Sequence, residues 1–208
     1  MEKNLDLFEI RNWFAHNLCD YLREKENEDL EKLLTVIEVI EKECVETDER
    51  IGKVIVSEFP LIKKKNSKLS LKREELDPFT EEYLKEKATA YREFLQSLEK
   101  FEPVGNDIEK NILIARKLFE AKLYFEVHEL LEELWMGEFG KYREFLQALI
   151  QLGVAYYHLT NYNLRGFELL LKNARELLEP YSGEIYGVNV DLLKKEFENP
   201  NPDKIIDF

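Results

Sequence analysis

The stretch 141–160, KYREFLQALIQLGVAYYHLT, decides the fold of the second half of this chain. When its residues are projected around a helix at about 100° per residue, apolar or small side chains point in almost every direction. A helix that is apolar nearly all the way round is packed on most of its sides, so this one should lie at the centre of a bundle. Three polar residues interrupt it, Gln147, Gln151 and His158, and they fall within roughly 40° of one another.

Helical periodicity continues on both sides of this segment. Apolar residues recur at three- and four-residue steps over 108–121, 124–136 and 163–179, and a short helix is expected near 190–198. The connections are short, so neighbouring helices should pack antiparallel. We therefore expect an all-α fold whose C-terminal part is a bundle of four to five helices.

An additional helical region is expected before this bundle. Helices are predicted over 5–25, 27–45 and 78–101, the last because it begins at an Asp-Pro pair that is typical of a helix start. Residues 51–59 contain a β-branched run, which leaves a short strand and a helix as alternatives.

Two breaks in the helical pattern divide the chain. The lysine-rich stretch 61–77 lacks a clear helical period and is the best boundary candidate. The stretch 102–107, with its proline and glycine, is a second break, and we place the start of the C-terminal domain there. The expected organisation is an N-terminal helical region of open role over 1–101 and a helical domain over 102–208.

The net charge of −13 argues against some classes of partner. Both halves of the chain are acidic, so a phosphate backbone would be repelled and we expect no nucleic-acid partner. One basic island is interpreted as a solvated loop, with anion binding as the alternative: Lys63, Lys64, Lys65, Lys68, Lys72 and Arg73. Charged residues make up 35% of the chain, with a surplus of Glu and Lys that fits the surface of a heat-adapted protein.

Cysteine usage and hydropathy indicate the cytoplasm. Cys19 and Cys44 do not form a CxxC motif, and the N-terminal sequence MEKNLDLFEI has no signal-peptide core. No apolar run approaches the roughly 20 residues that a membrane span needs. We therefore expect a cytoplasmic protein with two reduced thiols and no membrane partner.

The helix before the central one carries the first set of candidate functional residues. His128, Glu132 and Trp135 line one edge of its apolar face, and the first two are one helical turn apart. Such a His–Glu pair can perform acid–base chemistry or share a divalent metal ion, while Trp135 would wall the pocket. On the same projection Glu129 and Glu133 point outward. The second histidine of the HExxH zinc motif is absent.

The polar stripe on the central helix forms the second set. A buried amide without a partner costs about 1–3 kcal/mol, so side chains, water, a ligand or a metal must satisfy Gln147 and Gln151. If a metal binds, the expected ligands are His128, Glu132 and His158. Because Gln147 and His158 stand about 16 Å apart along the helix, one small compact ligand cannot reach both.

Two residues at the start of the following helix complete the candidates. Asn163 is most simply an N-cap, with a ligand contact as the alternative. Arg165 can pair with a carboxylate of the site or bind an anion at the helix N-terminus.

The residues of this half resemble a known family. The phrases LFEAKLYFEVHELLEELW, FLQALIQLGVAYYHLTNYNLRGFELLLKNARELLEPY and GVNVDLL, which lie between Leu118 and Leu193, are similar to the helical family catalogued as domain of unknown function 309. The match covers about residues 108–197. The resemblance implies a small all-α bundle without an established activity. It also implies a set of characteristic polar residues, which includes Glu129 against its outward placement: His128, Glu129, Glu132, Trp135, Gln147, Gln151, His158, Asn163 and Gly166.

Two functions stay open at this point. The first is a hydrolase-type enzyme, metal-assisted or acid–base, that acts on a small molecule. Its catalytic candidates are His128, Glu129 and Glu132, and its ligand-binding candidates are Trp135, Gln147, Gln151, His158, Asn163 and Arg165. The second is a non-catalytic helical module for protein interaction or dimerisation, in which the polar cluster is structural. Its partner would be another protein or a second copy of the chain.

Overall fold

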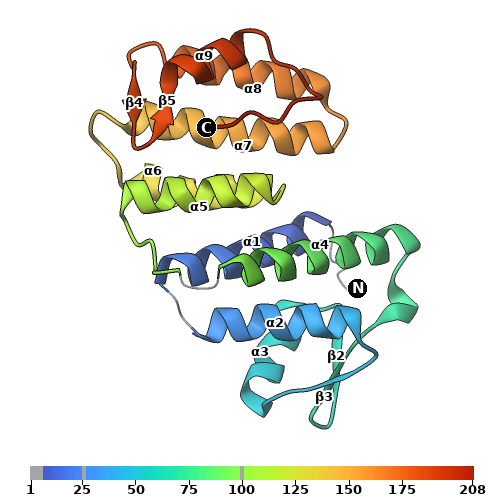
Figure 1. The fold of residues 1–208 in the computed structure, drawn as a ribbon. Helices are drawn as coiled ribbons and strands as arrows, with labels where there is room; N and C mark the ends of the chain where they lie inside the picture. The colour runs from blue at the N-terminus through green and yellow to red at the C-terminus, as the bar shows by residue number, and fades with distance from the viewer. Residues whose placement is uncertain (1–6, 25–26, 99–100) are drawn as a thin grey trace. The chain divides into compact units, whose positions relative to one another are not determined.

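The chain forms two compact units, Met1–Pro103 (unit 1) and Val104–Phe208 (unit 2). The computed structural model describes residues 7–24, 27–98 and 101–208. In this part of the chain both units are built mainly from α-helices with a few short antiparallel strands, so the predicted all-α class is confirmed (Figure 1). The helix ends expected at positions 5 and 25, and helix positions 99–100, lie outside the described residues.

Among the described helices, none has the length and apolar character that a membrane span requires.

Unit 1 is organised around α2, which packs against α1 and α4 and also contacts α3 and β3. Its main elements are α1 (Leu7–Glu24), α2 (Asn27–Glu41), β1 (Val45–Glu46), α3 (Glu49–Glu58), β2 (Ile62–Lys65), β3 (Lys68–Leu71) and α4 (Pro78–Ser97). Asp48 and Asp77 begin α3 and α4 because their carboxylates accept backbone N–H groups of the first turn. The three strands form one antiparallel sheet in the order β1-β3-β2.

In two segments of unit 1 the structure decides what the sequence left open or corrects what it predicted. Residues 51–59, for which strand and helix were alternatives, are helical as far as Glu58. The stretch 61–77 is not a boundary, because it lies inside unit 1 and contains the β2–β3 hairpin. Asn66 has a φ of 57° in the tight turn of this hairpin, a left-handed conformation that Asn tolerates better than most residues.

Much of the basic island is paired with neighbouring acids. Lys63 forms an ion pair with Glu74, Lys72 with Glu75, and Arg73 with Glu81. These pairs are at least partly exposed, so they contribute little stability. The island is therefore largely solvent-exposed, but the loop expected for it is wrong, because Lys63, Lys64, Lys65 and Lys68 lie in the strands β2 and β3.

Unit 2 is a stack in which each helix contacts its neighbour in the sequence: α5 with α6, α6 with α7, α7 with α8, and α8 with α9. Its elements are α5 (Ile108–Glu120), α6 (Tyr124–Gly137), α7 (Arg143–Thr160), α8 (Leu164–Leu177), β4 (Glu184–Ile185), β5 (Val188–Asn189) and α9 (Val190–Glu198). The predicted C-terminal bundle of four to five helices is confirmed, with five helices in the described residues of this unit.

The central position predicted for α7 is confirmed by its burial. Its buried residues lie on most sides of the helix: Phe145, Leu146, Ala148, Leu149, Ile150, Leu152, Gly153, Ala155 and Tyr156. Gly153 marks a close approach to α6, since a Cβ there would lie 3.0 Å from the backbone oxygen of Tyr124 and 3.1 Å from Val127 Cβ. Any side chain at Gly153 would therefore push α6 and α7 apart.

The α5–α6 and α7–α8 connections use the same backbone turn. Lys122 has a φ of 59° and Tyr162 a φ of 57°, both left-handed. The amide after each of them bonds back into the preceding helix, at 2.9 Å in both cases: Leu123 N–H to Leu118 O, and Asn163 N–H to His158 O. This Schellman arrangement satisfies the last carbonyls and reverses the chain.

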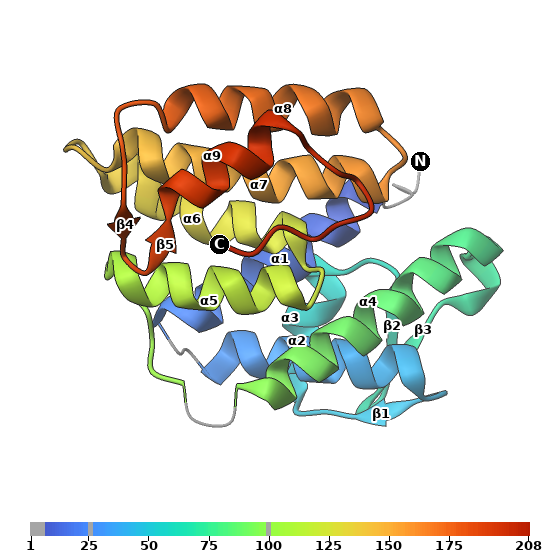
Figure 2. The same ribbon diagram turned by 45° about the horizontal axis from the view of Figure 1, so that its top comes forward.

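After α9 the chain returns across unit 2 (Figure 2). The Tyr156 hydroxyl donates to the Lys204 carbonyl at 2.6 Å and accepts the Ile206 N–H at 3.1 Å. Phe208 packs edge-on against Phe119 of α5, with 5.3 Å between the ring centroids. Burial raises the pKa of Tyr156 to about 12, so the hydroxyl keeps the proton that it donates at neutral pH. The returning segment thus ties the end of the stack to α5 and α7.

Replacing Tyr162 by glycine should stabilise unit 2. The tyrosine is 98% exposed, so its loss removes almost no packing, while the left-handed φ costs a non-glycine residue roughly 1–2 kcal/mol. Glycine gains freedom in the unfolded chain, which offsets part of this. We expect the free energy of unfolding of unit 2 to rise by roughly 0.5–1 kcal/mol in urea denaturation followed by Trp135 fluorescence, with Trp13 replaced by Phe in both chains compared. Tyr162→Ala keeps the strained backbone, and a gain of the same size in that variant would contradict this explanation.

Candidate functional site

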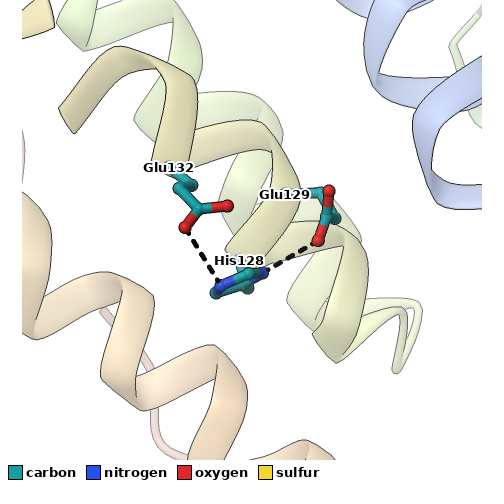
Figure 3. Close-up of side chains that lie close together, drawn as sticks. All are labelled: His128, Glu129 and Glu132. Atoms are coloured by element: carbon teal, nitrogen blue, oxygen red, sulfur yellow. Dashed lines mark hydrogen bonds and ion pairs between the residues drawn. The ribbon is translucent and has the colours of Figure 1, made fainter. Parts of the chain in front are cut away.

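One histidine of α6 lies between two carboxylates of the same helix (Figure 3). His128 Nδ1 is 3.1 Å from Glu129 Oε1, and His128 Nε2 is 3.8 Å from Glu132 Oε1. One potential ligand atom from each of the three residues lies within 4.8 Å of the others. We call these three residues, His128, Glu129 and Glu132, the His128 cluster. Among the described residues, it is the one group of at least three His, Cys, Asp or Glu side chains that lie close enough together to hold a metal ion.

The two carboxylates of the His128 cluster differ in exposure. The side chain of Glu129 is 15% exposed and that of Glu132 is 43% exposed, while His128 is 22% exposed. The outward placement expected for Glu129 is therefore wrong. Its carboxylate is directed at His128, and Oε1 lies within hydrogen-bond distance of His128 Nδ1. Glu133 is exposed, as the helical projection predicted.

Aromatic rings support the imidazole from one side. Phe125, about one turn earlier in α6, stacks on His128 with 5.6 Å between ring centroids and an interplanar angle of 29°. Tyr157 of α7 packs against Phe125 at a centroid distance of 5.6 Å. These contacts restrict the imidazole and exclude water from one face of it. Phe125 is not among the residues predicted from the sequence, although its position three residues before His128 places the two on one helix face.

The geometry of the cluster fits an orienting carboxylate and a pair of metal ligands. Glu129 can accept the Nδ1–H proton of His128, which leaves Nε2 unprotonated and able to bind a metal or take up a proton. Zinc binds nitrogen and oxygen ligands at about 2.0–2.2 Å, so two ligand atoms separated by 3.8 Å can share one ion. Two protein ligands leave further coordination positions for water and substrate.

His158, the third candidate metal ligand, is held by a different network. Its Nδ1 lies 2.9 Å from Asn163 Nδ2, and Asn163 Oδ1 accepts the Gly166 N–H at 2.9 Å. Because the amide oxygen is bonded to Gly166, the amide nitrogen donates to the histidine, whose Nδ1 therefore carries no proton. The N-cap role predicted for Asn163 is confirmed. The structure does not bring His158 into the His128 cluster, so the set His128, Glu132 and His158 is not assembled.

Trp135 contacts Arg143, which is not among the residues predicted from the sequence. The Arg143 guanidinium lies 3.9 Å from the centroid of the Trp135 ring, a cation–π distance. Arg143 also donates to the carbonyls of Trp135 and Glu138 at 2.7 and 2.8 Å. These bonds satisfy carbonyl groups at the end of α6, so Arg143 caps that helix and covers the indole. A cationic residue at the start of the next helix is the sequence signal for such a cap.

The remaining candidates are in different surroundings. Gln147 and Gln151 are both half-buried on α7, and Gln151 Oε1 is buried without a hydrogen-bond partner in the described part of the chain. Arg165 is exposed and forms no ion pair with any described residue. The anion or carboxylate partner considered for Arg165 would therefore have to come from outside the described residues.

Comparison with known proteins found a family and a relative that are similar to this chain. The family model described as "Domain of unknown function (DUF309)" matches residues 112–170, so the resemblance seen in the sequence is confirmed over a shorter stretch than 108–197. The protein described as "Uncharacterized protein YpuF" from Bacillus subtilis (strain 168) is 35% identical over 69 residues, 33% of this chain and 40% of that protein. The chain thus spans less than half the length of this relative. No solved structure matches the chain.

The tight contact at Gly166 predicts that Gly166→Ala destabilises unit 2. A Cβ there would lie 2.7 Å from Asn163 Nδ2 and 2.9 Å from His158 Cγ, so the cap and its histidine would have to separate. Overpacking and a lost cap together outweigh the better helix propensity of alanine, and we expect a net loss of about 1–2 kcal/mol in urea denaturation. Gly137→Ala is the matched control, because nothing lies within 4 Å of its Cβ. Equal effects in both variants would refute the role of the cap.

Proposed function

We propose that unit 2 carries a metal-assisted hydrolytic site at the His128 cluster. The observation that carries this proposal is that both ring nitrogens of one half-buried histidine face carboxylates of α6. A single carboxylate is enough to pair with a surface histidine. The second one adds an oxygen ligand beside the other ring nitrogen, which is how a helix presents two ligands to one ion across a single turn.

Each residue of the cluster has a separate role in this proposal. His128 Nε2 and the Glu132 carboxylate bind a divalent ion such as zinc or manganese, whereas Glu129 fixes the ring orientation through Nδ1–H. An ion held in this way would lower the pKa of its bound water and polarise a carbonyl or phosphoryl oxygen. Esters and phosphoesters of small molecules are therefore the substrate classes to test. The more exposed Glu132 gives them access from solvent.

A second candidate function is a non-catalytic helical module for protein interaction. It is favoured by exposed apolar side chains just after the cluster, Met136 at 55% exposure and Phe139 at 87%. Apolar groups exposed together in this way are typical of surfaces that contact another protein or a second copy of the same chain. In this case the His128 cluster is a hydrogen-bonded group of side chains that needs no metal.

Metal binding separates the two candidates. The full chain, purified without a histidine tag and stripped with EDTA, is titrated with zinc and with manganese in a calorimeter. We expect one metal ion per chain, and hydrolysis of p-nitrophenyl acetate or p-nitrophenyl phosphate that depends on that ion. His128→Ala should abolish both, Glu132→Gln should weaken binding at least tenfold, and Glu129→Gln should weaken it about 10–100-fold, as loss of an orienting partner does.

His158→Ala is the matched control, because it removes a histidine from unit 2 that lies outside the cluster. Its metal affinity should equal that of the unmodified chain. If the chain binds no metal, or if His128→Ala binds as well as the unmodified chain, the hydrolytic proposal fails and the interaction module is the better explanation.

A further inference from the structure

We propose a ligand site in unit 1, a hollow that binds a small, uncharged apolar molecule with one hydroxyl group, an alkyl or aryl alcohol. The hollow has a volume of about 280 Å³ and lies between α1, α2 and α4. Most of its wall consists of leucine side chains: Leu30, Leu34, Leu95 and Leu98. Because all of its lining residues belong to unit 1, the site is independent of the function proposed for the His128 cluster.

Tyr21 supplies the observation that points to a ligand. This residue lines the hollow and is only 9% exposed, yet its hydroxyl group forms no hydrogen bond with any described residue. The hydroxyl oxygen is not sealed in the core, because it is absent from the described atoms that are both buried and unpartnered. A tyrosine buried to this extent usually has a hydrogen-bond partner for its hydroxyl group. A partner from outside the described chain is therefore expected in the hollow.

The surroundings of Tyr21 make its hydroxyl group a fixed donor. Burial raises the pKa of Tyr21, so the hydroxyl keeps its proton at neutral pH. Phe101 packs edge-on against the phenol ring, with 5.2 Å between the ring centroids, which restricts the ring. A ligand oxygen that accepts from this hydroxyl would be held at one end of an apolar wall.

The apolar wall continues to the surface. Leu34 is 39% exposed, and Leu30 and Leu95 are half-buried. A hydrocarbon chain or ring that covers these side chains removes apolar surface from water, which favours binding. The volume is close to the lower end of small-molecule sites, which span roughly 300–1,000 Å³, so the ligand has to be small.

The rim of the hollow favours an uncharged ligand. Arg92 lines it, but its Nε and Nη2 atoms donate to the two carboxylate oxygens of Glu41 at 2.8 and 2.6 Å. This bidentate pair neutralises the guanidinium, so a carboxylate ligand would find no unpaired cation there. The net charge of −13 on the chain opposes an anion further. A hydroxyl group suits the site better, since it accepts from Tyr21 and still has a proton to donate to the exposed Gln96.

NMR titration of the full chain, with ¹³C-labelled leucine methyl groups, tests this proposal with 1-octanol as the probe. We expect saturable shifts of the methyl signals of Leu30, Leu34 and Leu95, and weaker binding of octanoate, which has the same chain length and a negative charge. Tyr21→Phe removes only the hydroxyl group and should weaken octanol binding about three- to tenfold, as the loss of one hydrogen bond does. Leu34→Ala removes part of the wall and should also weaken it.

Tyr162→Phe is the matched control, because it removes the same atom from a tyrosine that is 98% exposed in unit 2. Its octanol affinity should equal that of the unmodified chain. If octanol shifts none of the three leucine signals, or if Tyr21→Phe binds it as tightly as the unmodified chain, water satisfies the hydroxyl and the proposal is wrong. Tighter binding of octanoate than of octanol would overturn the uncharged class of ligand. If Tyr21→Phe fails to fold, Leu34→Ala decides, and an unchanged affinity in that variant rejects the site.

Discussion

The architecture of unit 2 depends on how closely α6 and α7 approach each other at Gly153. With the Tyr124 backbone oxygen only 3.0 Å from where a Cβ would stand, the two helices meet almost backbone to backbone. This contact holds α7 in the middle of the stack, where it is buried on most sides. It also places Tyr157 of α7 against Phe125 of α6, the ring on which His128 rests. The position of the His128 cluster therefore follows from a contact made by the smallest residue of the central helix.

The polar residues of unit 2 lie in three separate surroundings. His158 and Asn163 stabilise the turn between α7 and α8, where the amide satisfies both the histidine and a helix N-terminus. The cluster around His128 has the donor atoms and spacing of a metal site. Gln151 Oε1 is buried on α7 without a hydrogen-bond partner among the described residues. The separation is physical, because the two ends of the α7 polar stripe are too far apart to act on one small molecule.

Helical periodicity predicted the elements of unit 2 well, because each of its helices buries a broad apolar face against a neighbour. The β2–β3 hairpin was not predicted. Its strands are short and rich in lysine, so the alternating burial of Leu69 and Leu71 is hard to recognise in the sequence. Asn66 forms the turn between the strands. At the candidate site, the one-turn spacing of His128 and Glu132 was readable from the sequence. The inward turn of Glu129 was not, because the rotamers and local hydrogen bonds that decide it lie beyond helical projection. For the same reason the sequence could not assign His158 to a cap.

A stack in which each helix contacts mainly its neighbour in the sequence behaves like a short linear array, and such arrays can open one element at a time from an end. The segment after α9 changes this behaviour. Its hydrogen bonds to Tyr156 join the last part of the chain to the central helix, across a large separation in sequence. Opening of α9 must then also break contacts at the core, which couples the end of the array to its middle. Because the end of the chain is bonded to the central helix, the helices of unit 2 should unfold together in one cooperative transition.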